Sequence, residues 1–201
     1  MINSFVFVLI SYLIGAIPFG IVIGWIAKSK DIRKLGTGNA GASNTFLVIG
    51  PFAAILTAIL DISKGFFLVY LAWIVFNDEI MVSLTGIAVI CGHIWPIFFA
   101  FKGGKGIATV FGVFLFLSWQ SVVLALICWL IIVILWQYVA LTNVIACMLM
   151  PVFCLFFNLP IEYICFAAIV SLLMIYSHRT NIKKYFKGEE LSFLEIIKKS
   201  N

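Results

Sequence analysis

Charged residues are scarce in this chain. Asp, Glu, Lys and Arg make up only 10% of its 201 residues, whereas 64% are hydrophobic. Several apolar runs approach or exceed the ~20 residues that a helix needs to cross a bilayer. The composition therefore excludes a soluble domain and predicts an all-α polytopic membrane protein.

Histidine and paired cysteine are also lacking. The two histidines, His93 and His178, have no clear set of partner ligands, so no metal site is expected. The five cysteines lie singly in apolar runs, at positions 91, 128, 147, 154 and 165, and none forms a CxxC pair. This spacing indicates neither zinc binding nor a disulfide framework.

The apolar runs predict about seven transmembrane helices in a single domain, residues 1–201. The first run has no basic n-region and is too long for a signal peptide, so we expect a retained span, which Pro18 would kink. The expected spans are Ser4–Ala27, Pro51–Phe76, Ile80–Phe101, Ile107–Leu117, Val122–Leu135, Leu141–Phe157 and Ile161–Tyr176. The fourth is short for a full crossing, so five spans with re-entrant segments are the alternative.

Basic residues set the expected orientation. They fall in the first loop, the third loop and a polar tail at about 177–201: Lys28, Lys30, Arg33, Lys34, Lys102, Lys105, Arg179, Lys183, Lys184, Lys187, Lys198 and Lys199. The loops between them carry Asp78, Glu79 and Glu162 and no lysine or arginine. The positive-inside rule therefore places the N-terminus outside and the C-terminus in the cytoplasm. The net charge of +5 reports this topology, and no nucleic-acid partner is expected.

One polar stretch, the glycine–lysine loop from Lys102 to Gly106, has the features of a phosphate site. Its glycines let successive backbone N–H groups turn toward one point, and its two lysines add positive charge. Ile107 then begins a helix, whose N-terminus favours anions. The loop is not a P-loop, because Gly106 stands where Ser or Thr is required. The alternative is a tight turn whose lysines mark the cytoplasmic side.

Two further polar segments are expected on the cytoplasmic side. Residues 36–44 combine glycines with hydroxyl and amide side chains, which can wrap a polar ligand or simply cap the next helix. Residues 177–182 include His178 and Asn181, which would share a face if the last helix continues.

Asp61, Lys64 and His93 are ionisable residues in the interior of the expected spans. Asp61 and Lys64 are three residues apart on one face of the second span. A lone charge at mid-membrane costs about 2.5–3.5 kcal/mol on insertion scales, and pairing offsets part of that cost. We interpret the two as a structural pair that holds the bundle and a neighbouring loop, with a proton or ion path as the alternative. His93 is interpreted as a neutral donor to a neighbouring loop.

These motifs together resemble the PlsY family, the membrane-integral acyl-phosphate:glycerol-3-phosphate acyltransferases of bacteria. The similar segments are Ser11–Gly20, Asp31–Arg33 with Gly36–Asn44, Asp61–Gly65, Gly92–Thr109, His178–Ile182 and Gly188–Glu190. The resemblance implies a seven-helix fold in the bacterial cytoplasmic membrane, with the active site facing the cytoplasm. It implies acyl transfer from long-chain acyl phosphate to the 1-hydroxyl of glycerol 3-phosphate, giving lysophosphatidic acid for phospholipid synthesis. It calls for no cofactor and implies a partner enzyme that produces acyl phosphate.

The resemblance also implies roles for individual residues. His178, Asn181 and Thr37 would be catalytic, orienting substrate or stabilising the developing oxyanion. The residues that would bind substrate and its phosphate are Asn39, Asn44, Gly103, Gly104, Lys105 and Gly106. Structural support would come from Asp61, Lys64, His93 and Glu190, with Glu190 tying the tail in place. Because acyl phosphate is already an activated mixed anhydride, placement and charge stabilisation could carry catalysis without a covalent nucleophile.

Two positions depart from the family's pattern. The arginine expected three residues after Asn44 is Leu47, and the serine expected shortly after Tyr138 is Ala140. Both expected side chains would contact a phosphorylated substrate, so their loss predicts weakened activity. The alternative functions are a family member that has lost its activity and a membrane carrier or binding protein for a phosphorylated metabolite.

The expected orientation can be tested by labelling. Cysteines introduced by Asn77→Cys and Asn158→Cys should react with an impermeant thiol reagent added to intact cells, and Lys187→Cys should not. Labelling of the last variant from outside would overturn the orientation.

Overall fold

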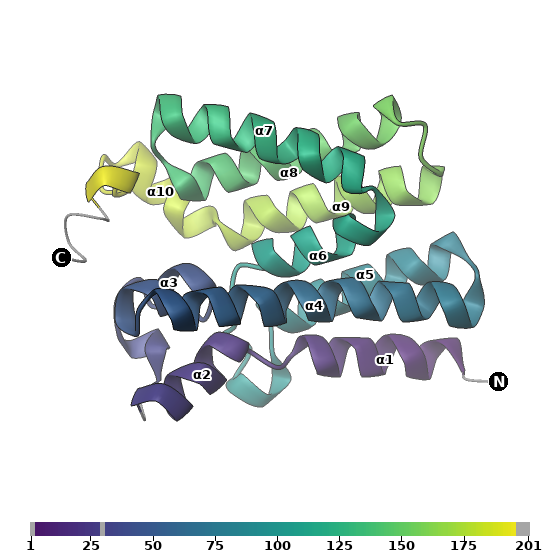
Figure 1. Cartoon of the computed structure of the whole chain (residues 1–201), viewed down its shortest axis with the longest axis horizontal. Coiled ribbons are helices and arrows are strands. Elements are labelled where there is room, and N and C mark those ends of the chain that lie inside the picture. Colours follow the sequence, from purple (N-terminus) through teal and green to yellow (C-terminus); the bar gives the residue numbers. More distant parts are fainter. Residues whose placement is uncertain (1–2, 29–30, 196–201) are drawn as a thin grey trace. The chain divides into compact units, whose positions relative to one another are not determined.

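The computed structural model describes residues 3–28 and 31–195, and within these ranges it contains helices and no strand (Figure 1). The expected all-α fold is confirmed. The chain divides into two compact units, Met1–Leu117 and Ser118–Asn201. Lys30, Lys198 and Lys199, which contribute to the expected orientation, lie outside the described residues.

The first unit is organised along one long helix, α4, against which α3, α5 and α6 pack. Figure 1 shows α3 at the end where α4 begins, and α1 and α2 following each other along α4. The elements are α1 (Ser4–Gly15), α2 (Phe19–Lys28), η1 (Ile32–Lys34), α3 (Ala42–Val48), α4 (Pro51–Phe76), α5 (Glu79–Ile94), η2 (Ile97–Phe99) and α6 (Ile107–Leu117).

Glycines bring these helices into backbone contact. A Cβ atom on Gly15 of α1 would overlap the backbone of Val89 in α5, and one on Gly92 of α5 would overlap the backbone of Tyr12 in α1. Gly65 brings α4 against α6 in the same way. Such small residues are typical of helix packing in membranes, where close van der Waals contact replaces the hydrophobic effect.

The first apolar run is broken near Pro18, as expected from the sequence. α1 ends at Gly15, and α2 begins at Phe19. The carbonyl groups at a helix C-terminus have no intrahelical donors. Lys64 of α4 supplies two hydrogen bonds here, from Nζ to Gly15 O at 3.1 Å and to Ile17 O at 2.9 Å. A lysine within one expected span thus holds the break in another.

The second unit holds α7 (Trp119–Trp136), α8 (Val139–Phe156), α9 (Ile161–Ser177) and α10 (Arg179–Phe186). α8 packs against α7 and α9, and α10 contacts both α8 and α9. Trp129 Nε1 of α7 donates to Asn143 Oδ1 of α8 at 2.7 Å. α9 and α10 meet at a bend of 56°, so part of the expected polar tail is helical.

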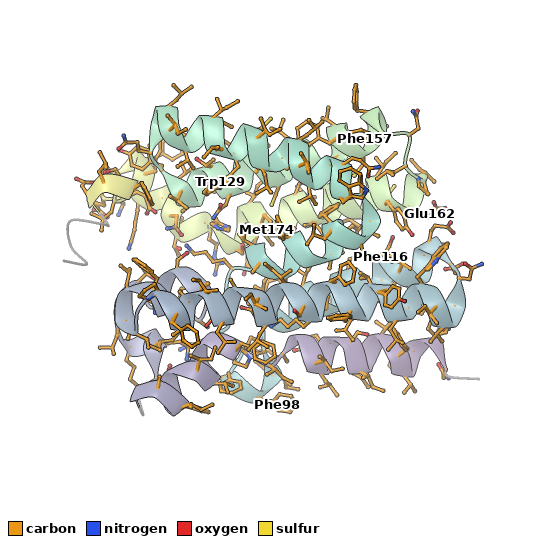
Figure 2. The ribbon with its side chains drawn as sticks, viewed as in Figure 1. Phe98, Phe116, Trp129, Phe157, Glu162 and Met174 are labelled. Carbon is orange, nitrogen blue, oxygen red and sulfur yellow. The ribbon has the colours of Figure 1, made fainter. Side chains whose placement is uncertain are left out.

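Five segments of the described chain are long and apolar enough to cross a membrane: Ser4–Ala27, Pro51–Phe76, Glu79–Phe99, Trp119–Trp136 and Val139–Phe156. A sixth exists if the bent pair α9–α10 is one span, and α6 is a shorter apolar helix. Large apolar side chains project outward from the helices, as Figure 2 shows, and Phe52 and Leu135 are 81% and 80% exposed. An apolar exterior of this kind suits lipid contact.

The helix boundaries follow the sequence closely in α4 and α6. The third expected span ends earlier than predicted, at Ile94 rather than Phe101, because Pro96 cannot continue the α-helix. The chain continues through the short η2, from which the side chain of Phe98 points away from the helices and is 65% exposed (Figure 2). This early end of α5 leaves residues 95–106 to form the approach to α6.

Candidate functional site

Asn44 organises the polar segment 36–44 from within. Its side chain is fully buried, and its Nδ2 donates to Ile32 O and to Asn39 O, both at 2.8 Å. Its Oδ1 accepts from the Thr37 N–H at 2.7 Å. The amide therefore makes three contacts with loop backbone, which gives Asn44 a loop-holding role. Thr37 is exposed and Asn39 half-buried, so these two present their side chains at the surface of the segment.

Arg33 of η1 connects the chain just before this segment with the approach to the glycine–lysine loop. Its Nη1 donates to Phe99 O at 3.0 Å and to Lys102 O at 3.1 Å. Its Nε donates to both carboxylate oxygens of Asp31, and its Nη2 donates to Oδ2, at distances of 2.7–3.2 Å. The Phe99 ring also packs on a buried cluster that contains Ile32. The sequence interpretation missed this role, although the Asp31-x-Arg33 spacing offered a signal for a local ion pair.

The Asp31–Arg33 pair has a defined pH dependence. The side-chain hydrogen bond from Arg33 holds the pKa of Asp31 below its ordinary value. A carboxyl whose pKa is lowered by folding contributes stability above the pKa of the unfolded chain. This contribution is lost as the pH falls through the lowered pKa, so the pair stays intact at neutral pH.

The glycine–lysine loop lies against the C-terminus of α5. The Gly103 N–H donates to Ile94 O at 3.2 Å, and the Gly104 N–H donates to His93 O at 3.1 Å. These bonds satisfy two carbonyl groups at the end of α5. The two amides therefore bond to carbonyl groups within the protein, and the expected binding of phosphate by Gly103 and Gly104 stays a prediction.

Lys105 and Gly106 directly precede α6 in the chain. Lys105 is half-buried. Gly106 is buried and has φ at 92°, a conformation that residues with a side chain rarely adopt. α6 starts at Ile107, and the N–H groups of a first helical turn have no intrahelical acceptors. A lysine beside the positive end of a helix favours an anion. Lys105, Gly106 and the start of α6 thus have the chemistry expected of a phosphate site.

Behind the loop lies a buried ionic network. Asp61 Oδ1 lies 2.8 Å from Lys64 Nζ and 3.4 Å from His93 Nδ1. The three residues are only 1%, 7% and 3% exposed, respectively. Because Lys64 also bonds to two carbonyl groups at the α1–α2 break, the network joins α1, α4 and α5. These contacts support the interpretation of Asp61 and Lys64 as a structural pair.

The polar residues of the second unit lie at the bend between α9 and α10. His178 is 1% exposed and ends α9, with its Nδ1 lying 3.0 Å from Met174 O. Asn181 is in α10, and its Nδ2 donates to Glu190 Oε1 at 2.7 Å. The bend means that α9 does not continue through Asn181, so the condition under which His178 and Asn181 would share a face of the last helix is not met. The Asn181–Glu190 contact is the kind of tie that the resemblance implies for Glu190.

These observations define a class of protein: an integral membrane protein of packed α-helices, with a glycine–lysine loop at a helix N-terminus. The chain belongs to the glycerol-3-phosphate acyltransferase family, whose model matches residues 5–188. The glycerol-3-phosphate acyltransferase of Prochlorococcus marinus (strain MIT 9215) is 40% identical over 182 residues, which are 90% of this chain and 92% of that relative. The corresponding protein of Desulforamulus reducens is 36% identical over 189 residues, 94% of each chain.

Solved structures support the same assignment. The crystal structure of PlsY (YgiH), an integral membrane glycerol 3-phosphate acyltransferase in its glycerol 3-phosphate form, matches with a TM-score of 0.90 and 35% identity. The match covers 96% of this chain and 98% of that one. The lysophosphatidic acid form of PlsY gives a TM-score of 0.89 at 34% identity.

The loop-holding role of Asn44 predicts a loss of stability on Asn44→Asp. This nearly isosteric change puts a carboxylate oxygen opposite Ile32 O and Asn39 O, which costs about 1–3 kcal/mol for each buried carbonyl left without a donor. The thermal unfolding midpoint in detergent should fall, whereas Ser43→Ala, at an exposed neighbour, should leave it unchanged. An unchanged midpoint with lost activity would instead show that Asn44 acts on the substrate directly.

Proposed function

We propose that this protein transfers a fatty acyl group from acyl phosphate to the 1-hydroxyl of glycerol 3-phosphate, giving lysophosphatidic acid for phospholipid synthesis. The observation that carries the proposal is the family membership over nearly the whole chain, together with a loop suited to phosphate at the start of α6. Both substrates carry a phosphate group, so a site of this kind serves this reaction directly.

In the proposed reaction, the 1-hydroxyl oxygen forms a bond to the acyl carbon, and the bond from that carbon to the phosphate oxygen breaks. The hydroxyl proton ends on the released phosphate. The protein's task is to place the two substrates and to stabilise the charge that develops on the acyl oxygen. We assign phosphate binding to Lys105, Gly106 and the start of α6, with Asn39 contributing from the segment that Asn44 holds.

The catalytic assignments follow the family resemblance. Thr37 offers an exposed hydroxyl, and Asn181 is oriented by Glu190. A neutral His178 that donates its Nδ1–H to Met174 O carries its lone pair on Nε2, as an acceptor for a substrate hydroxyl would. In this proposal His178 orients the substrate hydroxyl, and Asn181 and Thr37 orient the substrate or stabilise the oxyanion.

We further propose seven crossings, obtained by counting α6 and α9 as spans alongside the five long segments, with α10 in the cytoplasmic tail. The N-terminus is then outside, and the polar loops face the cytoplasm of a bacterial cell. The distribution of lysine and arginine supports this arrangement. A separate enzyme that produces acyl phosphate is the partner that such a donor requires.

The two departures from the family's pattern favour a weak enzyme as the second candidate. Arg33 is held by Asp31 and two carbonyl groups, so its guanidinium is occupied and does not replace the arginine expected at Leu47. Leu47 itself is half-buried in α3 and offers no donor. A carrier function finds less support, because Asp61 and Lys64 are engaged in contacts that join helices.

The phosphate role of Lys105 predicts a large effect of Lys105→Ala. A lost charge-assisted contact of about 1.5–3 kcal/mol corresponds to roughly a ten- to hundredfold drop in kcat/KM for glycerol 3-phosphate or acyl phosphate. Lys187→Ala removes the same charge from an exposed position after α10 and should have little effect. Equal and small effects of the two changes would show that the loop is a simple turn without a phosphate-binding role.

The departures predict a gain of function. Leu47→Arg combined with Ala140→Ser should raise kcat/KM for glycerol 3-phosphate on the order of tenfold or more, because a planar guanidinium and a hydroxyl can each bond to phosphate oxygens. Leu47→Gln with Ala140→Ser provides the uncharged control and should gain less. Full native activity without any gain in the double variant would show that neither position limits the enzyme.

A further inference from the structure

The ring of His93 separates the ionic network from the glycine–lysine loop. On one side its Nδ1 faces Asp61 Oδ1 at 3.4 Å. His93 Nδ1 has no hydrogen-bond partner among the described residues, and Asp61 Oδ1 is the polar atom that it faces. Asp61 in turn is paired with Lys64 at 2.8 Å, and that lysine is anchored on the carbonyl groups of Gly15 and Ile17. The ring is therefore set by contacts that reach as far as α1.

On its other side the ring meets the loop. A Cβ atom placed on Gly104 would overlap Nε2 of His93, with the neighbouring ring carbons also too close. At Gly103 a Cβ atom would instead overlap a backbone atom, His93 O. The two glycines thus face different parts of the same residue: Gly104 lies against the imidazole, and Gly103 lies against the carbonyl.

We infer that His93 is a positioning residue for the phosphate site, and that the Asp61–Lys64 pair acts by holding the His93 ring under Gly104. This inference rests on the proposed phosphate-binding role of the loop. The ring sets how deeply the backbone of Gly104 sits, and Lys105 and Gly106 follow directly in the chain. A shift of the ring therefore displaces the groups that meet phosphate, and no contact between His93 and substrate is needed.

The two glycines provide a matched test, because Gly104 lies against the His93 side chain and Gly103 lies against the His93 backbone. Gly104→Ala should raise the KM for glycerol 3-phosphate or acyl phosphate about tenfold or more, with a smaller change in kcat, because the loop must move off the ring. Adding His93→Asn removes Nε2 but keeps an amide that can reach toward Asp61. The double variant should recover most of the lost KM.

Gly103→Ala serves as the control. Its added methyl group meets a backbone carbonyl, which His93→Asn does not remove, so the second change should bring no recovery. Recovery of Gly103→Ala equal to that of Gly104→Ala would contradict the inference, as would a Gly104→Ala defect that His93→Asn leaves unchanged. Folding is checked by the thermal unfolding midpoint of each variant in detergent.

A second readout does not depend on catalysis. Limited trypsin cleavage after Lys102 and Lys105 reports how firmly the loop is held. It should be faster in Gly104→Ala and return toward the native rate in the double variant. If the native protein shows no acyl transfer, the proposed function fails. The cleavage pattern then decides the positioning role separately, since an unchanged rate in Gly104→Ala would overturn it.

Discussion

A buried pair of opposite charges within a membrane helix is the constraint on which the first unit depends. Asp61 and Lys64 are costly to place in a membrane, and removal of one partner from such a pair typically costs about 3–5 kcal/mol because the other charge is left uncompensated. The cost is offset by what the pair connects. Lys64 supplies donors where α1 ends near Pro18, and Asp61 faces the His93 ring beneath the glycine–lysine loop. One helix, α4, thus fixes both the break in the first apolar run and the loop before α6.

The conformation of the glycine–lysine loop depends on contacts with neighbouring elements. The amides of Gly103 and Gly104 satisfy the end of α5, and Arg33 holds the carbonyl groups of Phe99 and Lys102. These contacts therefore fix the first part of the loop, Lys102–Gly104, before any substrate arrives. Pre-organisation of this kind is what acyl transfer from an activated donor requires, since the protein has mainly to place the reactants and to stabilise charge.

Much of this arrangement could be predicted from the sequence, and the physical reasons are local. Pro51 begins α4 and Pro18 breaks the first run, because proline fits the first turn of a helix and disrupts its interior. The glycine–lysine loop and the start of α6 were visible as a sharp change from apolar to polar residues. The contacts of Asn44 and Arg33 could not be predicted, because each side chain bonds to backbone carbonyl groups elsewhere in the chain. A sequence pattern does not show which separate groups lie close together in the fold. The commitment of the Gly103 and Gly104 amides, and the bend at His178, likewise depend on where α5 and α9 end in three dimensions. The roles of His178, Asn181 and Thr37 stay predictions.

The most direct test of the account is a crystal structure of this protein with bound glycerol 3-phosphate. We expect the phosphate to lie within hydrogen-bond distance of Lys105 Nζ and the first amides of α6, with the His93 ring still facing Asp61. A phosphate bound away from the glycine–lysine loop, with Lys105 directed elsewhere, would contradict the central claim that the buried network holds the substrate's phosphate site.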